Sequence, residues 1–210
     1  MFSQKLLLAL ALGLAASFPL SAQTDGYPEL NRRLAAYGQA SEALDIPTIL
    51  DYVDPRLFDI VPREMMEMQF AQMLDSSEIR TTLHGFAYGS PTDSVATDSA
   101  RFLLVPFRGK IRMELRDAEL RDSSAMAVMT EMFRAQYGTD MVTVDTAHYR
   151  YTVRLDKQLV AIKRRRVGGA AGAVPPQTGP WYFIEFRPNL AEMMQPIIPE
   201  SAQRALKLID

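Results

Sequence analysis

The chain has 210 residues, of which 48% are hydrophobic and 23% charged, and its formal net charge is −2. This is the composition of an ordinary globular protein, and the charge gives no indication of nucleic-acid binding. The chain contains no cysteine, which excludes disulfides, thiol catalysis and a lipid anchor on cysteine.

Residues 1–22 have the pattern of a secretory signal peptide. Lys5 gives a positive start, an apolar run follows from Leu6 to Ala16, and small residues precede Gln23. The run is shorter than the roughly 20 apolar residues of a membrane span, and no later segment approaches that length. We therefore predict a cleaved signal, no integral membrane segment after cleavage, and an exported bacterial protein, periplasmic or secreted. An uncleaved anchor is the alternative.

Residues 23–210 are interpreted as one domain that begins with helices. Apolar residues at helical spacing predict helices over 27–42, 46–53 and 62–74. Asp45 precedes Ile46-Pro47, which is a capping residue followed by a proline in the first turn.

From residue 78 onward, apolar and polar residues alternate as they do in half-buried strands. The predicted elements are strands at 78–88, 101–116, 141–155 and 181–188, a hairpin turning at Asp156-Lys157, a helix at 121–137 and a closing helix at 198–208. Segment 89–99 is predicted as a polar connection and 167–180 as a flexible loop. Pro106 and Gly109 are expected to mark a bulge or bend, and 181–188 to be a central strand.

Helices followed by long alternating strands predict an α+β fold, with N-terminal helices packed on a curved antiparallel sheet. The order of elements, the late WYFIEF strand and the segment DYVDPRLFDIVP at 51–62 resemble the nuclear transport factor 2-like (cystatin-like) cone fold, more narrowly its exported bacterial members of unknown function. The resemblance implies a cone with an interior. It selects no function, because that superfamily includes isomerases, dehydratases, ligand carriers and protein-binding modules.

The candidate ligand-binding residues are inward positions of the predicted strands. Tyr149 and Tyr151 share the apolar phase of strand 141–155, and Met113 and Trp181 belong to the apolar phase of their own strands. We predict that these four line a site for a small apolar ligand. Core tyrosines with satisfied hydroxyls are the alternative.

No catalytic set and no metal site emerges from the sequence. His84 and His148 fall on polar strand faces and are interpreted as solvated or cross-strand side chains rather than catalytic ones. Asp145 shares the phase of Tyr149 but lies near a strand start. The methionine-rich stretch from Glu64 to Met73 suits either a copper site or core packing, and we favour core packing. No metal and no cofactor is predicted.

Lys163-Arg164-Arg165-Arg166 is the most concentrated run of charge. Such a run could bind an acidic glycan, a phosphate-bearing headgroup or a protein partner. We favour a solvated strand end that keeps a sheet edge from aggregating.

The sequence thus favours an exported, non-enzymatic module that binds a small apolar ligand or a protein partner, and not nucleic acid. One alternative is an isomerase or hydro-lyase that uses Tyr149 or Tyr151 with a carboxylate the sequence does not locate. Another is a structural envelope protein that forms a homodimer through its sheet.

Overall fold

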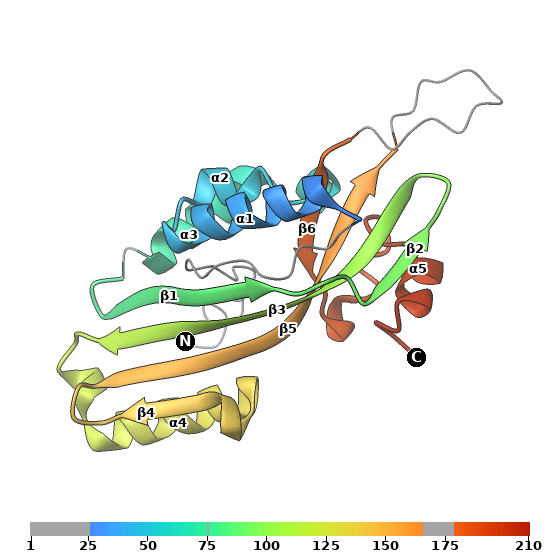
Figure 1. Cartoon of the computed structure of the whole chain (residues 1–210). Helices are drawn as coiled ribbons and strands as arrows, with labels where there is room; N and C mark the ends of the chain where they lie inside the picture. The colour runs from blue at the N-terminus through green and yellow to red at the C-terminus, as the bar shows by residue number, and fades with distance from the viewer. Residues whose placement is uncertain (1–25, 75, 166–178) are drawn as a thin grey trace.

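The structure is a computed structural model that describes residues 26–74, 76–165 and 179–210 (Figure 1). The predicted signal peptide at 1–22 lies outside the described residues. Most of the predicted loop at 167–180 does so too.

The described chain is an α+β fold, as predicted. In chain order its elements are α1 Pro28–Glu42, α2 Ile46–Leu50, η1 Pro55–Asp59, α3 Arg63–Leu74, β1 Ile79–Tyr88, β2 Asp93–Ala96, β3 Ala100–Leu115, η2 Glu119–Arg121, α4 Ser123–Tyr137, η3 Thr139–Met141, β4 Val142–Asp145, β5 Arg150–Arg164, β6 Trp181–Glu185, η4 Pro188–Leu190 and α5 Glu200–Ala205. The five helices confirm the predicted helical segments.

Aspartate side chains cap the N-termini of α2, η1 and α4. The Asp45 carboxylate accepts a hydrogen bond from the Thr48 backbone N–H at 3.2 Å and begins α2, as the sequence predicted. Asp54 begins η1 in the same way, and Asp122 begins α4.

Two long strands, β3 and β5, form the centre of an antiparallel sheet that has six strands within the described residues. β1 and β2 pair with successive halves of β3, and β4 and β6 pair with opposite ends of β5. The sheet therefore has a β1/β4 half and a β2/β6 half, joined by β3 and β5 (Figure 1).

Alternate residues of the long strands supply two separate hydrophobic clusters. The first cluster lies on the sheet face that α1, α2, α3 and α4 cover, and it runs through both halves. The second lies on the other face of the β2/β6 half and is closed by Met194, Ile197, Ile198, Ala202 and Leu206 of the C-terminal segment. In Figure 1, α1 to α3 lie together on one side of the sheet and α4 runs beside β4.

The β-strands differ from the predicted ones in four places. Segment 89–99 contains β2. Segment 141–155 is not one strand but β4, a turn and the start of β5. Asp156 and Lys157 do not turn the chain, because β5 runs through them in unbroken register with β3. β6 is not a central strand. It pairs with β5 along one side, and on its other side Phe183 forms only an isolated bridge with Val53.

The predicted bulge is real but belongs to β1. The register between β1 and β3 shifts between His84 and Ala87, so that β1 carries the extra residue, with Gly85 at a φ of 67°. Gly109 of β3 lies opposite, and a Cβ there would stand 2.3 Å from the Phe86 ring. Gly109 therefore marks the position of the bulge because it makes room for Phe86.

None of the helices in the described ranges combines the length and apolarity needed to cross a membrane.

Candidate functional site

Tyr151 and Met113 lie opposite each other in the β3–β5 register, against α4. Tyr151 is fully buried, its hydroxyl donates to the Met126 carbonyl at 2.8 Å, and its ring meets Phe133 edge-on. Met113 is half-buried beside the same cluster. The Tyr151 hydroxyl is thus satisfied inside the protein, which is the arrangement of a core tyrosine.

Tyr149 and Trp181 lie apart from that pair. Tyr149 does not point inward from a strand: it sits in the β4–β5 turn at a φ of 49°, is exposed, and has the Arg121 guanidinium over its ring. Trp181 is buried beside Tyr27 and Lys163 at the other end of β5, about 40 Å along the strand from Tyr151. The four residues therefore do not surround one site.

Both histidines are exposed. The His84 Nε2 lies 3.1 Å from the Thr82 hydroxyl, and the His148 ring lies against the Asp145 carboxylate in the β4–β5 turn. In α3, Met66 is buried whereas Met65 and Met68 are exposed. Across the described residues, no group of three or more His, Cys, Asp or Glu side chains is placed to hold a metal ion.

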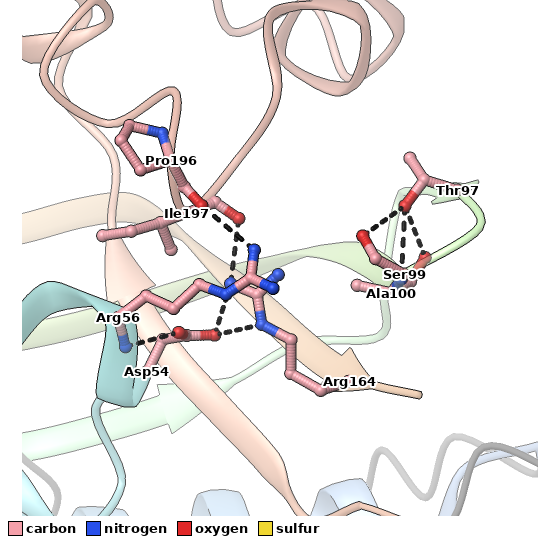
Figure 2. A network of polar contacts seen from close by, with 8 residues as sticks. All are labelled: Asp54, Arg56, Thr97, Ser99, Ala100, Arg164, Pro196 and Ile197. Atoms are coloured by element: carbon pink, nitrogen blue, oxygen red, sulfur yellow. Dashed lines mark hydrogen bonds and ion pairs between the residues drawn. The ribbon is translucent and has the colours of Figure 1, made fainter. Parts of the chain in front are cut away.

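At the end of β5, Lys163 and Arg164 are not the solvated side chains that were predicted, because they go to opposite faces of the sheet and each forms an ion pair. Lys163 pairs with Glu29 of α1 on the face of the first cluster. On the other face, Arg164 binds the fully buried Asp54 and also donates to the Ile197 carbonyl at 3.0 Å (Figure 2). Arg166 lies outside the described residues.

This Asp54–Arg164 network fastens three segments together. Asp54 caps η1, and Arg56 of η1 donates to the Pro196 carbonyl at 3.2 Å (Figure 2). Burial lowers the pKa of Arg164, while the charge of Asp54 acts to raise it. The network has a structural role: it holds η1 and the C-terminal segment on the end of β5.

A second polar group lies inside the first hydrophobic cluster, where the two halves of the sheet meet. We call it the waist cluster; its members are Tyr37, Ser41 and Glu42 of α1, Tyr88 of β1, Tyr137 of α4, Lys157 of β5, Glu185 of β6 and Arg187. Tyr88, Phe107 and Lys157 form one cross-strand row, which places Lys157 on the face that the helices cover.

Glu185 is the buried carboxylate of the waist cluster. Its side chain is 8% exposed, pairs with the Lys157 ammonium, and lies 3.8 Å from the Arg187 Nε. Burial raises the pKa of Tyr137 to about 12, with Arg187 opposing and Glu185 adding to the rise. Burial also raises the pKa of Tyr37, and the Glu185 charge contributes. The Glu185 carboxylate thus acts electrostatically on one tyrosine of α1 and one of α4.

The other end of the waist cluster holds buried polar atoms without partners. The Ser41 Oγ, the Glu42 Oε1 and the Tyr88 hydroxyl make no hydrogen bond with any described residue. Burial raises the pKa of Glu42, opposed by a hydrogen bond from the Gly85 backbone. Burial, with the nearby Tyr37 and Glu42, raises the pKa of Tyr88.

Sequence reasoning missed the waist cluster because its members come from five separate elements and, with Arg187, from the segment after β6. Two local signals were present. Glu185 interrupts the apolar run WYFIEF, and Tyr37 and Ser41 lie four residues apart on the buried face of α1. Neither signal identifies its partners, which the β5 register and the α1–β1 packing bring together.

The waist cluster thus contains two hydroxyls and a carboxylate oxygen that could exchange hydrogen bonds with a further polar group, and the Tyr88 ring packs against Phe107. Comparison of the chain with protein-family models, curated proteins and solved structures found no match.

Proposed function

We propose that the protein binds a small, largely apolar molecule that carries a hydroxyl or amino group, and that the waist cluster receives this group. This proposal retains the predicted binding of a small apolar ligand but assigns it to a different site. The ligand would bind at the interface between α1 and β1 and not at Tyr149, Tyr151, Met113 and Trp181. The chemistry of Ser41, Glu42 and Tyr88 selects the polar group.

One observation carries the proposal. Three side-chain oxygens of α1 and β1 are buried and satisfied by no described residue, and two of them, on Glu42 and Tyr88, are close enough to interact electrostatically. A buried polar atom left without a partner costs about 1–3 kcal/mol, so native proteins satisfy nearly all such atoms with protein, water or ligand. A bound hydroxyl or amino group can donate to the Glu42 carboxylate and exchange hydrogen bonds with the two hydroxyls.

The test is native mass spectrometry of the protein purified after expression of the full chain. We expect an additional bound mass on the wild-type protein. The Tyr88→Phe and Ser41→Ala variants should lose it, because each removes one hydroxyl at little cost in volume. Tyr149→Phe is the matched control, since the exposed Tyr149 lies far from the waist cluster, and it should keep the mass.

Two results would contradict this function. If the wild-type protein carries no additional mass, no ligand is bound and the proposed function is wrong. A mass that Tyr149→Phe loses and Tyr88→Phe keeps places the ligand at the site predicted from the sequence. The same spectra report the number of chains, so a mass of two chains supports the alternative of a homodimer formed through the sheet.

An enzyme that uses the waist cluster is the second candidate. The observation in its favour is the raised pKa of Glu42 next to Tyr88, since an acid–base catalyst needs a pKa near the working pH. With the base removed, the Glu42→Gln variant should retain the unaltered substrate, whereas the wild-type protein should convert and release it. The compounds extracted from the two proteins are compared by chromatography and fragmentation, which distinguish isomers of equal mass. The same compound in both extracts would count against this candidate.

The remaining proposals concern location and family. Export is supported by the N-terminal sequence pattern, and the likeness to the nuclear transport factor 2-like cone by the order of helices and antiparallel strands. N-terminal sequencing of the protein recovered from cells tests the first: a chain that begins after Ala22 supports cleavage, and one that begins at Met1 contradicts it.

A further inference from the structure

One face of the β1/β4 half of the sheet is covered by no described helix. The second hydrophobic cluster covers this side only in the β2/β6 half, and the four helices of the first cluster lie on the opposite side. By the register, the side chains on the uncovered face are Arg80, Thr82 and His84 of β1, Arg108, Lys110, Arg112 and Glu114 of β3, Thr143 and Asp145 of β4, and Arg150, Thr152, Arg154 and Asp156 of β5. We call it the basic face.

The centre of the basic face holds positive charge that no neighbouring strand position balances. Lys110 stands directly between His84 and Arg154 in the register, and Arg112 stands between two threonines. Like charges in directly opposed strand positions repel each other. Lys110, Arg112 and Arg154 are all exposed. An anion in solution can therefore reach these side chains and relieve their mutual repulsion.

The acidic residues of the face lie in its outer rows. Asp156 pairs with Arg108 at 3.3 Å, and Glu114 stands between Arg80 and Arg150 in the register. The chain as a whole has a net charge of −2, yet basic side chains outnumber acidic ones here. The positive charge is therefore concentrated on one surface of an acidic protein, which is the distribution that orients a protein toward an anionic partner.

We propose that the basic face docks on an anionic lipid surface. Its basic residues are spread over β1, β3 and β5, so several of them can contact separate headgroups of one lipid layer at the same time. The described side chains on it include no Phe, Tyr or Trp, whereas single-stranded nucleic acid is held by stacking on aromatic rings. The sequence also predicts export, which brings a chain to membranes rather than to nucleic acid.

The strength of such docking follows from the number of basic residues near the headgroups. Each Lys or Arg near an anionic membrane surface contributes about fivefold to binding, and salt screens the contribution. The removal of Lys110 and Arg112 together should therefore weaken vesicle binding about thirtyfold. These two are suited to the test because both are exposed and neither forms an ion pair among the described residues.

The experiment is co-sedimentation of the purified full-length protein with vesicles of phosphatidylglycerol and phosphatidylcholine. We expect binding to the anionic vesicles that rises with their phosphatidylglycerol content and falls with added salt. The double variant Lys110→Gln/Arg112→Gln should lose it. The matched control Arg32→Gln/Lys207→Gln removes the same charge from exposed positions of α1 and the C-terminal segment, and should bind as the wild type does. Circular dichroism confirms that both variants are folded.

Three outcomes would overturn the proposal. Equal binding to vesicles of pure phosphatidylcholine shows that an apolar segment, not charge, makes the contact. Equal losses in the two double variants show that net charge matters and the basic face does not. Binding to soluble heparin or to an oligonucleotide, without binding to anionic vesicles, assigns the face to a different polyanion.

Discussion

Arg164 contacts the fully buried carboxylate of Asp54 through two nitrogens, the Nε at 2.9 Å and the Nη2 at 2.8 Å, and both lie on the same oxygen, Oδ2. The other oxygen, Oδ1, accepts a hydrogen bond from the Arg56 backbone N–H at 3.1 Å, so each carboxylate oxygen has its own partner. Because Asp54 also caps η1 and Arg164 ends β5, the pair connects the N-terminal helical region to the end of a central strand.

Replacement of Asp54 should therefore destabilise the protein strongly. Asp54→Ala leaves the Arg164 guanidinium without its counter-charge and removes the η1 cap, and we expect a loss of about 3 kcal/mol or more in the free energy of unfolding. Urea denaturation measures it. The control is Asp51→Ala, which breaks the solvent-exposed pair with Arg63 and should cost less than about 1 kcal/mol. Equal losses would show that burial of the Asp54 pair is unimportant.

The Phe86–Gly109 contact should make Gly109 intolerant of any side chain. Gly109→Ala places a Cβ 2.3 Å from a buried ring, and we expect a loss of about 3 kcal/mol from overpacking at the bulge. The double variant Gly109→Ala/Phe86→Ala should lose less than the sum of the two single variants, because the clash is then absent. Strict additivity in thermal or urea unfolding would contradict the contact.

Tyr151 should act as a core residue. Tyr151→Phe removes the hydrogen bond to the Met126 carbonyl and should lower the free energy of unfolding by about 1 kcal/mol. Tyr149→Phe, in the exposed turn, should leave stability unchanged. If Tyr151→Phe were instead neutral in stability and abolished the bound mass, the sequence-based interpretation of Tyr151 as a ligand residue would be correct.

Glu42 should give stability a definite dependence on pH. Its pKa is raised in the folded protein above 4.5, its usual value. Below pH 4.5 the carboxyl is protonated in both states and contributes nothing. As pH rises from 4.5 through the raised pKa, the unfolded state ionises first, so the stability of the fold decreases and then levels off.

Glu42→Gln removes this dependence. The variant should be more stable than wild type at neutral pH, and the difference should vanish below pH 4.5. Glu131→Gln, on the exposed side of α4, is the comparison, and it should show no gain. Chemical denaturation at a series of pH values measures both. A Glu42→Gln variant that is less stable at neutral pH would mean that the carboxylate is satisfied in the protein.

The helices were predictable because their signals are local. Pro28, Asp45 and Pro62 mark the starts of α1, α2 and α3, and the apolar spacing within each helix does the rest. The turn at 146–149 could not be predicted from the sequence, because it contains neither Gly nor Pro. Tyr149 adopts a positive φ there, and its alternation with Tyr151 imitates a continuous strand.

The opposite error occurred at Lys157. Two charged residues in succession suggested a turn, but Asp156 faces Arg108 on one side of β5 and Lys157 faces Glu185 on the other. The charges are compatible with a strand because each has a partner on a different neighbouring strand. The Lys157–Glu185 pair belongs to the waist cluster, so the information that would have located that cluster was the pairing of strands far apart in the sequence.

The alternation of β3 and β5 between two clusters has a consequence for how the molecule loses its structure. Leu103 and Leu159 belong to one cluster, and their neighbours Leu104 and Val160 belong to the other. Both clusters pack on β3 and β5, so the loss of packing in one cluster destabilises the strands on which the other cluster packs. We therefore expect the two clusters to melt in one cooperative transition, so that neither layer persists as an independent folding intermediate.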